Sequence, residues 1–371
     1  MRQATEEDRR APGMLTPDAD EMPRVVLTPR RIVLFAVFVL SALAFLYFFL
    51  PKLADLKDTW GRLDEGEPAW LVAGFLFEVL SFAGYIWLFR TVFVRGESRI
   101  DWRASYQITM AGVAATRLFA AAGAGGIALT AWAVRRSGME ARLVACRMIA
   151  FLGLLYTIFM SALVVFGLGL RVGIFSGPAP FGFTVVPAIF GGAVLCVGAL
   201  ICLLPQDAER RLERWSDGSG RLAHILARAV SIPASAASGL RTAARILHDR
   251  EPGALGAVMW WGFDIATLWA CFQAFGQSPP LAVLVLGYYV GQLANTLPLP
   301  GGIGAVEGGM IGTFLAFDVN SGLAVVAVLT YRAFAFWLPT IPGAVAYWQL
   351  RKTVARWRGS EAALTTGSHY T

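Results

Sequence analysis

Long apolar stretches separated by short polar segments dominate this chain. A helix needs about 20 mostly apolar residues to cross a hydrocarbon layer ~30 Å thick. Six stretches come close to or exceed that length without interruption, and each is predicted to be a transmembrane helix: residues 32–50, 69–94, 148–170, 183–204, 254–275 and 323–349. The pattern therefore predicts an all-α polytopic membrane protein.

Two further apolar stretches, 104–134 and 281–317, are interrupted by glycine or proline. The second contains TLPLPGGIGAVEGG at 296–309, where prolines, glycines and a carboxylate lie inside membrane-like sequence. Non-helical backbone at membrane depth is tolerated only where it is buried in protein or lines a wet cavity. This segment therefore predicts a substrate or ion site.

Basic residues predict the orientation, because they remain preferentially on the cytoplasmic side. Arginines are frequent at 95–103, 135–147, 205–253 and 351–358, whereas 171–182 and 276–281 carry almost no charge. Both termini are therefore expected in the cytoplasm of a cell-membrane protein. Since 95–103 and 135–147 then share one face, 104–134 is expected to enter and return as a hairpin of two half-helices. By the same argument, 281–317 re-enters from the opposite face; two tilted full spans are the alternative for each stretch.

The two halves of the chain resemble copies with opposite insertion. Repeat 1 (69–170) and repeat 2 (254–349) each comprise a helix, an interrupted hairpin and a helix, with Glu78 and Asp264 at matching depth. Gly-Gly-Ile recurs in both hairpins, at 125–127 and 301–303. Inverted repeats with broken helices at corresponding positions are typical of membrane transporters.

The remaining segments are short and polar. Residues 1–31 are expected to be a disordered cytoplasmic tail, 32–350 a single transmembrane domain, 205–253 a cytoplasmic amphipathic loop and 351–371 a cytoplasmic tail whose last dozen residues are disordered. With 56% hydrophobic and 15% charged residues, no soluble catalytic domain is expected. The cysteines and histidines match no metal motif, so no metal or cofactor is expected. The net charge of +7 follows the cytoplasmic boundary, which argues against nucleic-acid binding.

Charged residues inside the apolar segments are the candidate site. A charge near the bilayer centre costs roughly 2.5–3.5 kcal/mol on insertion scales, so it normally faces protein or water. The candidates are Glu78, Arg117, Asp264, Glu307 and Arg332. Arg117 and Arg332 suit a phosphate oxygen pair, and the amides of Gly301 and Gly302 would favour an anion at a helix N-terminus.

Glu307 is expected at the same substrate site, and Glu307, Glu78 and Asp264 are candidates for proton or cation coupling. Alternatively, these groups form only buried salt bridges, Arg117 with Glu78 and Arg332 with Asp264 or Glu307. Gly304, Gly308 and Gly312 are expected to pack a helix closely.

The run NTLPLPGGIGAVEGG (295–309), followed by YRAFAFWLP (331–339), resembles the C-terminal motif of the lysylphosphatidylglycerol synthase transmembrane family. The first hairpin of that family usually carries a Pro-Gly-Arg-Gly-Glu-like run, where this chain has TRLFAAAGAGGIALTAW (116–132). The resemblance implies movement of lipids or polyprenyl-linked lipids between leaflets. Lipid lysylation by this chain is not implied.

The function expected is a flippase-like transporter for a phosphate-bearing membrane lipid. An integral-membrane transferase acting on a polyprenyl-phosphate lipid, or a membrane partner protein without transport, are the alternatives. The sequence leaves the oligomeric state open.

Overall fold

The computed structural model describes residues 66–96, 98–118, 124–203, 236–296 and 302–367, and the regular structure in these ranges is entirely helical. The expected all-α class is confirmed. Within the described ranges, five helices are long and apolar enough to cross a membrane: Pro68–Phe93, Ala141–Arg171, Phe181–Leu203, Pro252–Phe275 and Ser321–Trp357. They coincide with five of the six expected spans, and the sixth, 32–50, lies outside the described residues with the tail 1–31.

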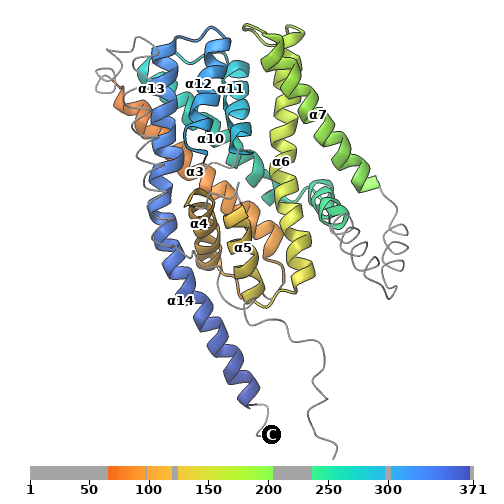
Figure 1. Ribbon diagram of the computed structural model, residues 1–371. Helices are drawn as coiled ribbons and strands as arrows, with labels where there is room; N and C mark the ends of the chain where they lie inside the picture. The colour runs from red at the N-terminus through yellow and green to blue at the C-terminus, as the bar shows by residue number, and fades with distance from the viewer. Residues whose placement is uncertain (1–65, 97, 119–123, 204–235, 297–301, 368–371) are drawn as a thin grey trace, which may run out of the picture.

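Four shorter helices form two pairs at opposite ends of the molecule (Figure 1). The first pair is Trp102–Leu118 (α4) with Ala124–Arg136 (α5), and the second is Leu281–Leu293 (α11) with Ala305–Ala316 (α12). A helix rises 1.5 Å per residue, so the 13 residues of α5 or α11 extend about 20 Å, less than the ~30 Å of a hydrocarbon layer.

The helices Pro68–Phe93 (α3) and Leu255–Phe275 (α10) pack antiparallel through the centre of the molecule. The backbone N–H of Glu67 donates to Ala274 near one end, and the Ser81 hydroxyl donates to the carbonyl of Trp260 further along. A Cβ atom at Gly84 would meet α10 backbone, and one at Gly256 would meet α3 backbone. Glycine at both positions thus lets the two helices approach closely, which brings their polar residues into contact.

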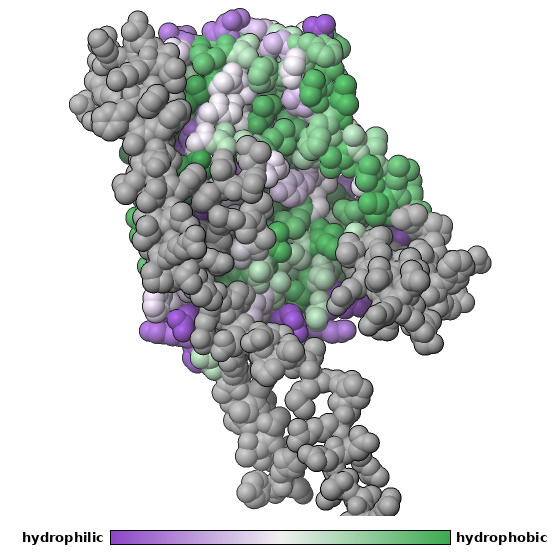
Figure 2. Space-filling view, viewed as in Figure 1, coloured by the Kyte–Doolittle hydropathy of each residue, from purple (hydrophilic) through white to green (hydrophobic). Residues whose placement is uncertain are grey.

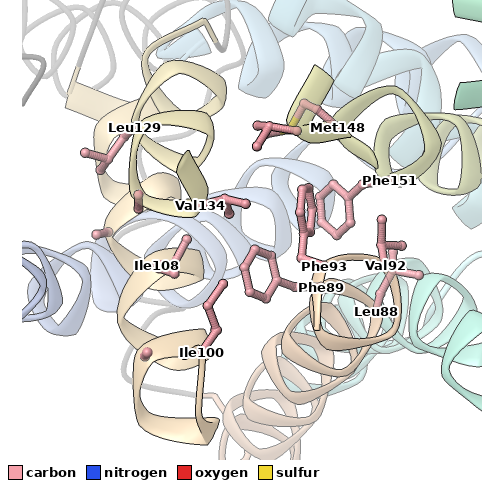
Figure 3. Packing of buried hydrophobic residues seen from close by; sticks show 14 of the residues in the cluster. Leu88, Phe89, Val92, Phe93, Ile100, Ile108, Leu129, Val134, Met148 and Phe151 are labelled. Atoms are coloured by element: carbon pink, nitrogen blue, oxygen red, sulfur yellow. The ribbon is translucent and has the colours of Figure 1, made fainter. Parts of the chain in front are cut away.

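Two apolar clusters form the core, one around each short helix pair. The cluster around α4 and α5 draws residues from α3 and from Ala141–Arg171 (α6), and Figure 3 shows Phe89, Phe93 and Phe151 packed together in it. The rings of Phe89 and Phe93 are stacked with centroids 4.8 Å apart. The other cluster joins α6 and α10 to α11, α12 and Ser321–Arg332 (α13). Each short pair is therefore held by long helices of both halves.

The last helix is longer than the apolar pattern predicts. It runs through α13, a π-helical turn Ala333–Trp337 and Leu338–Gly367 (α14). The expected span 323–349 is helical, and the helix continues beyond it to Gly367, through most of the dozen residues expected to be disordered. Leu350 and Val354 remain buried in the cluster around α4, and Thr353 donates to Gln107 at 2.8 Å, so the helix still has a partner beyond its apolar span.

The surface has apolar residues between hydrophilic ends, as Figure 2 shows for one face. The helix Phe181–Leu203 (α7) lies along α6 and exposes many of its large apolar side chains. The described part of the amphipathic loop is helical at 236–248, with Ala237, Ala243 and Ile246 buried. A broad apolar surface on a multi-pass helical protein is the expected lipid contact.

Candidate functional site

The five charged residues predicted from the sequence meet where α3 and α10 lie between the two short helix pairs. Glu78 of α3, Asp264 of α10, Glu307 of α12 and Arg332 at the end of α13 are all buried. Arg117, in the last turn of α4, is partly exposed and acts electrostatically on Glu78, Asp264 and Arg332. Residues from both halves of the chain thus form one polar centre.

Glu307 and Arg332 form a buried ion pair. Nε of Arg332 donates to Oε1 of Glu307 at 2.6 Å, and both side chains are less than a tenth exposed. The other oxygen of Glu307, Oε2, accepts from the backbone N–H of Gly304 at 2.7 Å. The carboxylate therefore caps its own helix and neutralises Arg332, so the salt-bridge alternative for Arg332 is realised with Glu307.

Arg117 has a different set of partners. Its Nη2 donates to the carbonyl of Ala335 at 2.6 Å, and its Nη1 donates to the carbonyl of Phe336 at 2.8 Å. In an α-helix the Ala335 carbonyl would accept from residue 339, but Pro339 has no N–H. Proline and the π-helical turn thus leave a backbone acceptor that Arg117 satisfies. Among the described residues Arg117 forms no direct ion pair, so its expected salt bridge with Glu78 is reduced to a longer-range interaction.

The ring of Phe336 lies beside both guanidinium groups. The centroid of the ring is 5.3 Å from Cζ of Arg117 and 4.4 Å from Cζ of Arg332. A cation is attracted to the face of an aromatic ring. Phe336 therefore helps to hold two like charges near each other, which is the arrangement that an anion would require.

Hydroxyl groups surround the two remaining carboxyl groups. Thr267 lies close to Glu78, with Oγ1 of Thr267 3.3 Å from Oε2 of Glu78. Tyr288 donates to Oδ2 of Asp264 at 2.5 Å. Sequence reasoning missed both residues, although Thr267 is three positions after Asp264 and so shares its helix face. Among the described residues, no group of three or more His, Cys, Asp or Glu side chains comes together to bind a metal ion.

A second polar group lies at the end of α11 and was also missed. Asn295 donates to Gln292, and Gln292 lies 3.4 Å from the hydroxyl of Tyr331. Asn295 and Thr296 are exposed, whereas Tyr331 is buried. The spacing of Gln292 and Asn295, three positions apart in an otherwise apolar stretch, could have indicated this polar group from the sequence. They form a hydrogen-bonded path from an exposed tip toward the charged centre.

The predicted anion-binding roles of Gly301 and Gly302 stay predictions. Gly301 lies outside the described residues, and Gly302, at φ +64°, packs against Asn295 and Val306. The backbone N–H of Gly304 donates to the side chain of Glu307. At the N-terminus of α12, where an anion was expected, this amide is therefore already bound to a carboxylate.

The expected packing role of Gly304, Gly308 and Gly312 is not found in the part of the chain that the structure describes. Within the described residues, a Cβ atom at any of the three would meet no atom within 4 Å. The close contact belongs instead to Gly309, which packs against Gly291 of α11.

The sequence of this chain matches a known family. Residues 32–343 match the family described as the lysylphosphatidylglycerol synthase TM region. A UPF0104 membrane protein of Methanothermobacter thermautotrophicus is 36% identical over 87 residues, which is 23% of this chain and 25% of that protein. UPF0104 membrane protein PH1989 of Pyrococcus horikoshii is 33% identical over 93 residues, covering 25% of this chain and 28% of that protein.

The aligned region spans about a quarter of the length of these relatives. The family match, in contrast, covers most of the chain and includes all five charged residues of the centre. The chain belongs to the lysylphosphatidylglycerol synthase TM region family.

Proposed function

We propose that this protein is a flippase-like transporter that moves a phosphate-bearing lipid between the leaflets of the cell membrane. In this proposal the α4–α5 and α11–α12 pairs are re-entrant hairpins that enter from opposite faces. Their lengths and their positions at opposite ends of the molecule support this topology. Inverted repeats with short broken helices meeting at the midplane are the architecture of many transporters.

The internal packing of the two pairs supports the repeat. In the first pair, a Cβ atom at Gly126 would overlap the carbonyl of Gly112. In the second pair, a Cβ atom at Gly309 would press on Gly291. Both pairs therefore close through a glycine on each helix, which allows two short helices to return along each other with little space between them.

The single observation that carries the proposal is the state of Arg117. It is a partly exposed cation at the central end of a short helix, held by two backbone carbonyls and without a direct ion pair among the described residues. Arg332, in contrast, is already neutralised by Glu307. A phosphate headgroup would therefore bind chiefly to Arg117, with Arg332 adding positive potential from behind.

The lipid tail would remain outside the protein. The surface of α3 exposes Val72, Phe75, Leu76 and Val79 toward the surroundings. Exposed apolar side chains on a membrane helix face acyl chains without loss of free energy. A headgroup in the polar centre and a tail along such a surface would let the lipid cross without burying its whole length.

The test is translocation of fluorescent phosphatidylglycerol in proteoliposomes, followed by the fraction that a membrane-impermeant quencher reaches. We expect Arg117→Ala to lower the initial rate at least about tenfold, since a hydrogen bond to a charged group contributes about 1.5–3 kcal/mol. Arg117→Lys retains the positive charge but loses the planar guanidinium group that can bind two phosphate oxygens. The translocation rate of this variant is therefore expected to be intermediate. Arg95→Ala, at an exposed ion pair away from the centre, is the control.

An unchanged rate in the combined Arg117→Ala and Arg332→Ala variant would reject the assigned roles. Mass spectrometry of the lipids from the same vesicles tests the transferase alternative. A lipid of altered mass would favour an enzyme over a transporter.

A further inference from the structure

One atom of the polar centre has no partner among the described residues. Oδ1 of Asp264 is buried and accepts no hydrogen bond from them, although Oδ2 of the same carboxyl group accepts from Tyr288. The carboxyl group of Glu78, on the antiparallel helix α3, is close enough to interact with Asp264 electrostatically. A buried, unpartnered carboxylate oxygen beside a second carboxyl group is unfavourable unless a proton or another cation lies between them.

The charges of the centre can be counted from its residues. Arg117 and Arg332 are positive, and Glu307, bound to Arg332 and to a helix N-terminus, is negative. If Glu78 and Asp264 were both ionised, the centre would carry a net charge of −1, whereas one proton on that pair makes it neutral. Burying a charge away from water costs several kcal/mol even after relaxation. The unliganded centre is therefore expected to hold one proton on the Glu78–Asp264 pair.

The net charge of the centre changes when an anion binds. A phosphodiester headgroup adds one negative charge beside Arg117, and neutrality then requires a second proton. We propose that binding of one phosphodiester headgroup at Arg117 is coupled to uptake of one proton by the Glu78–Asp264 pair, so that the anionic lipid and the proton cross together. This inference rests on the proposed function.

Other titratable groups near the pair do not change the count. The titratable groups that interact with the pair are Arg117 of α4, Cys271 of α10, Tyr288 and Tyr289 of α11 and Tyr331 of α13; Arg332 interacts with Arg117 and Tyr331. Cysteine and tyrosine are neutral at pH 7 and arginine is always protonated. The exchanged proton is therefore assigned to a carboxylate oxygen of Glu78 or Asp264, and it comes from the solvent.

Calorimetry measures this proton directly. Short-chain phosphatidylglycerol, below its micelle concentration, is titrated into the purified protein at pH 7 in two buffers whose ionisation enthalpies differ. A phosphodiester does not titrate at this pH, so the change in observed binding enthalpy between buffers gives the protons taken up by the protein. We expect about one proton per lipid, from the charge count above.

Variants separate the pair from the rest of the centre. The double variant Glu78→Gln with Asp264→Asn should still bind through Arg117, but with uptake near zero. Glu251→Gln, a partly exposed carboxyl group in the ion pair with Arg95, should behave like the unmodified chain.

Binding without proton uptake in the unmodified protein would overturn the coupling while leaving the phosphate site intact, and this result does not depend on any variant. Uptake that persists in the double variant would overturn its assignment to Glu78 and Asp264. Affinity that rises with Na⁺ at constant pH, without proton uptake, would assign the pair to a metal cation. If equilibrium dialysis of the same lipid also shows no saturable binding, the phosphate site itself is overturned, and this inference with it.

Discussion

The guanidinium group of Arg117 donates from Nη2 to the carbonyl oxygen of Ala335, 2.6 Å away and 218 positions later in the chain. This bond joins the end of a short helix in the first half to the π-helical turn of the last helix. Pro339, which has no N–H, does not compete for this carbonyl as an ordinary residue four positions later in an α-helix would. A helix defect and a partly exposed cation thus lie in direct contact.

Replacing Pro339 with alanine is expected to disrupt this relationship. Residue 339 would regain an N–H that can donate to Ala335, and the turn could then close as ordinary α-helix. Arg117 would lose its preferred acceptor, and the rate of phosphatidylglycerol translocation should fall about tenfold, a loss of roughly 1.4 kcal/mol. Pro342→Ala, in the same helix but without a contact to Arg117, is the control; equal rates in both variants would contradict the assigned role of the carbonyl.

Substituting either residue of the Glu307–Arg332 pair alone is expected to destabilise the fold strongly. Removing one partner of a buried ion pair leaves an unpaired charge. In other proteins this lowers the free energy of unfolding by about 3–5 kcal/mol. Arg332→Met alone and Glu307→Gln alone should therefore each lower the apparent melting temperature in detergent.

The variant with both changes should lose less than the sum of the two single losses, because no buried charge remains unpaired. Melting temperatures from intrinsic fluorescence give the comparison. Additive losses would indicate that the two side chains act independently, against the 2.6 Å contact. Glu251→Gln is the matched control, since breaking an exposed pair changes stability by at most about 1 kcal/mol.

Two helical glycines should respond in opposite ways to alanine. A Cβ atom at Gly126 would overlap the carbonyl of Gly112, so Gly126→Ala must separate α4 from α5 at a cost of about 1–3 kcal/mol. Gly308→Ala meets no described atom and gains helix propensity, so its stability should be unchanged or up to about 1 kcal/mol higher. Thermal unfolding of the two variants measures the difference. Similar destabilisation by both would mean that α12 packs through Gly308 after all.

The proposed hairpins predict which positions label from which side. In a variant without the four native cysteines, Arg99→Cys and Arg135→Cys flank the first pair and should both react with an impermeant maleimide from the cytoplasm only. Gln277→Cys and Ser321→Cys flank the second pair and should both react from the outside only. Inverted and right-side-out vesicles provide the two faces. Labelling of Arg99→Cys and Arg135→Cys from opposite faces would mean that α4–α5 crosses the membrane.

Much of the fold was predictable because its driving force is local. Each long helix corresponds to a continuous apolar run in the sequence. The interruption at Gly125-Gly126 likewise corresponds to the start of α5. The charged residues stood out for the same reason, since any charge in such a run is costly. The glycines at 304, 308 and 312 contact no other described helix. Their spacing indicates which residues share a face and says nothing about what that face contacts.

The sequence by itself determined that the chain is an all-α, multi-pass membrane protein with five charged residues at membrane depth, because hydrophobic run length and the cost of buried charge are properties of short segments. Only the tertiary structure decided which charges pair. Arg332 pairs with Glu307, and Arg117 donates to carbonyls near a proline. Asp264, near Glu78, has one oxygen without a partner among the described residues. These contacts depend on how α3, α10 and the two short pairs approach one another, and that approach is set by glycine contacts and packing between residues far apart in the chain.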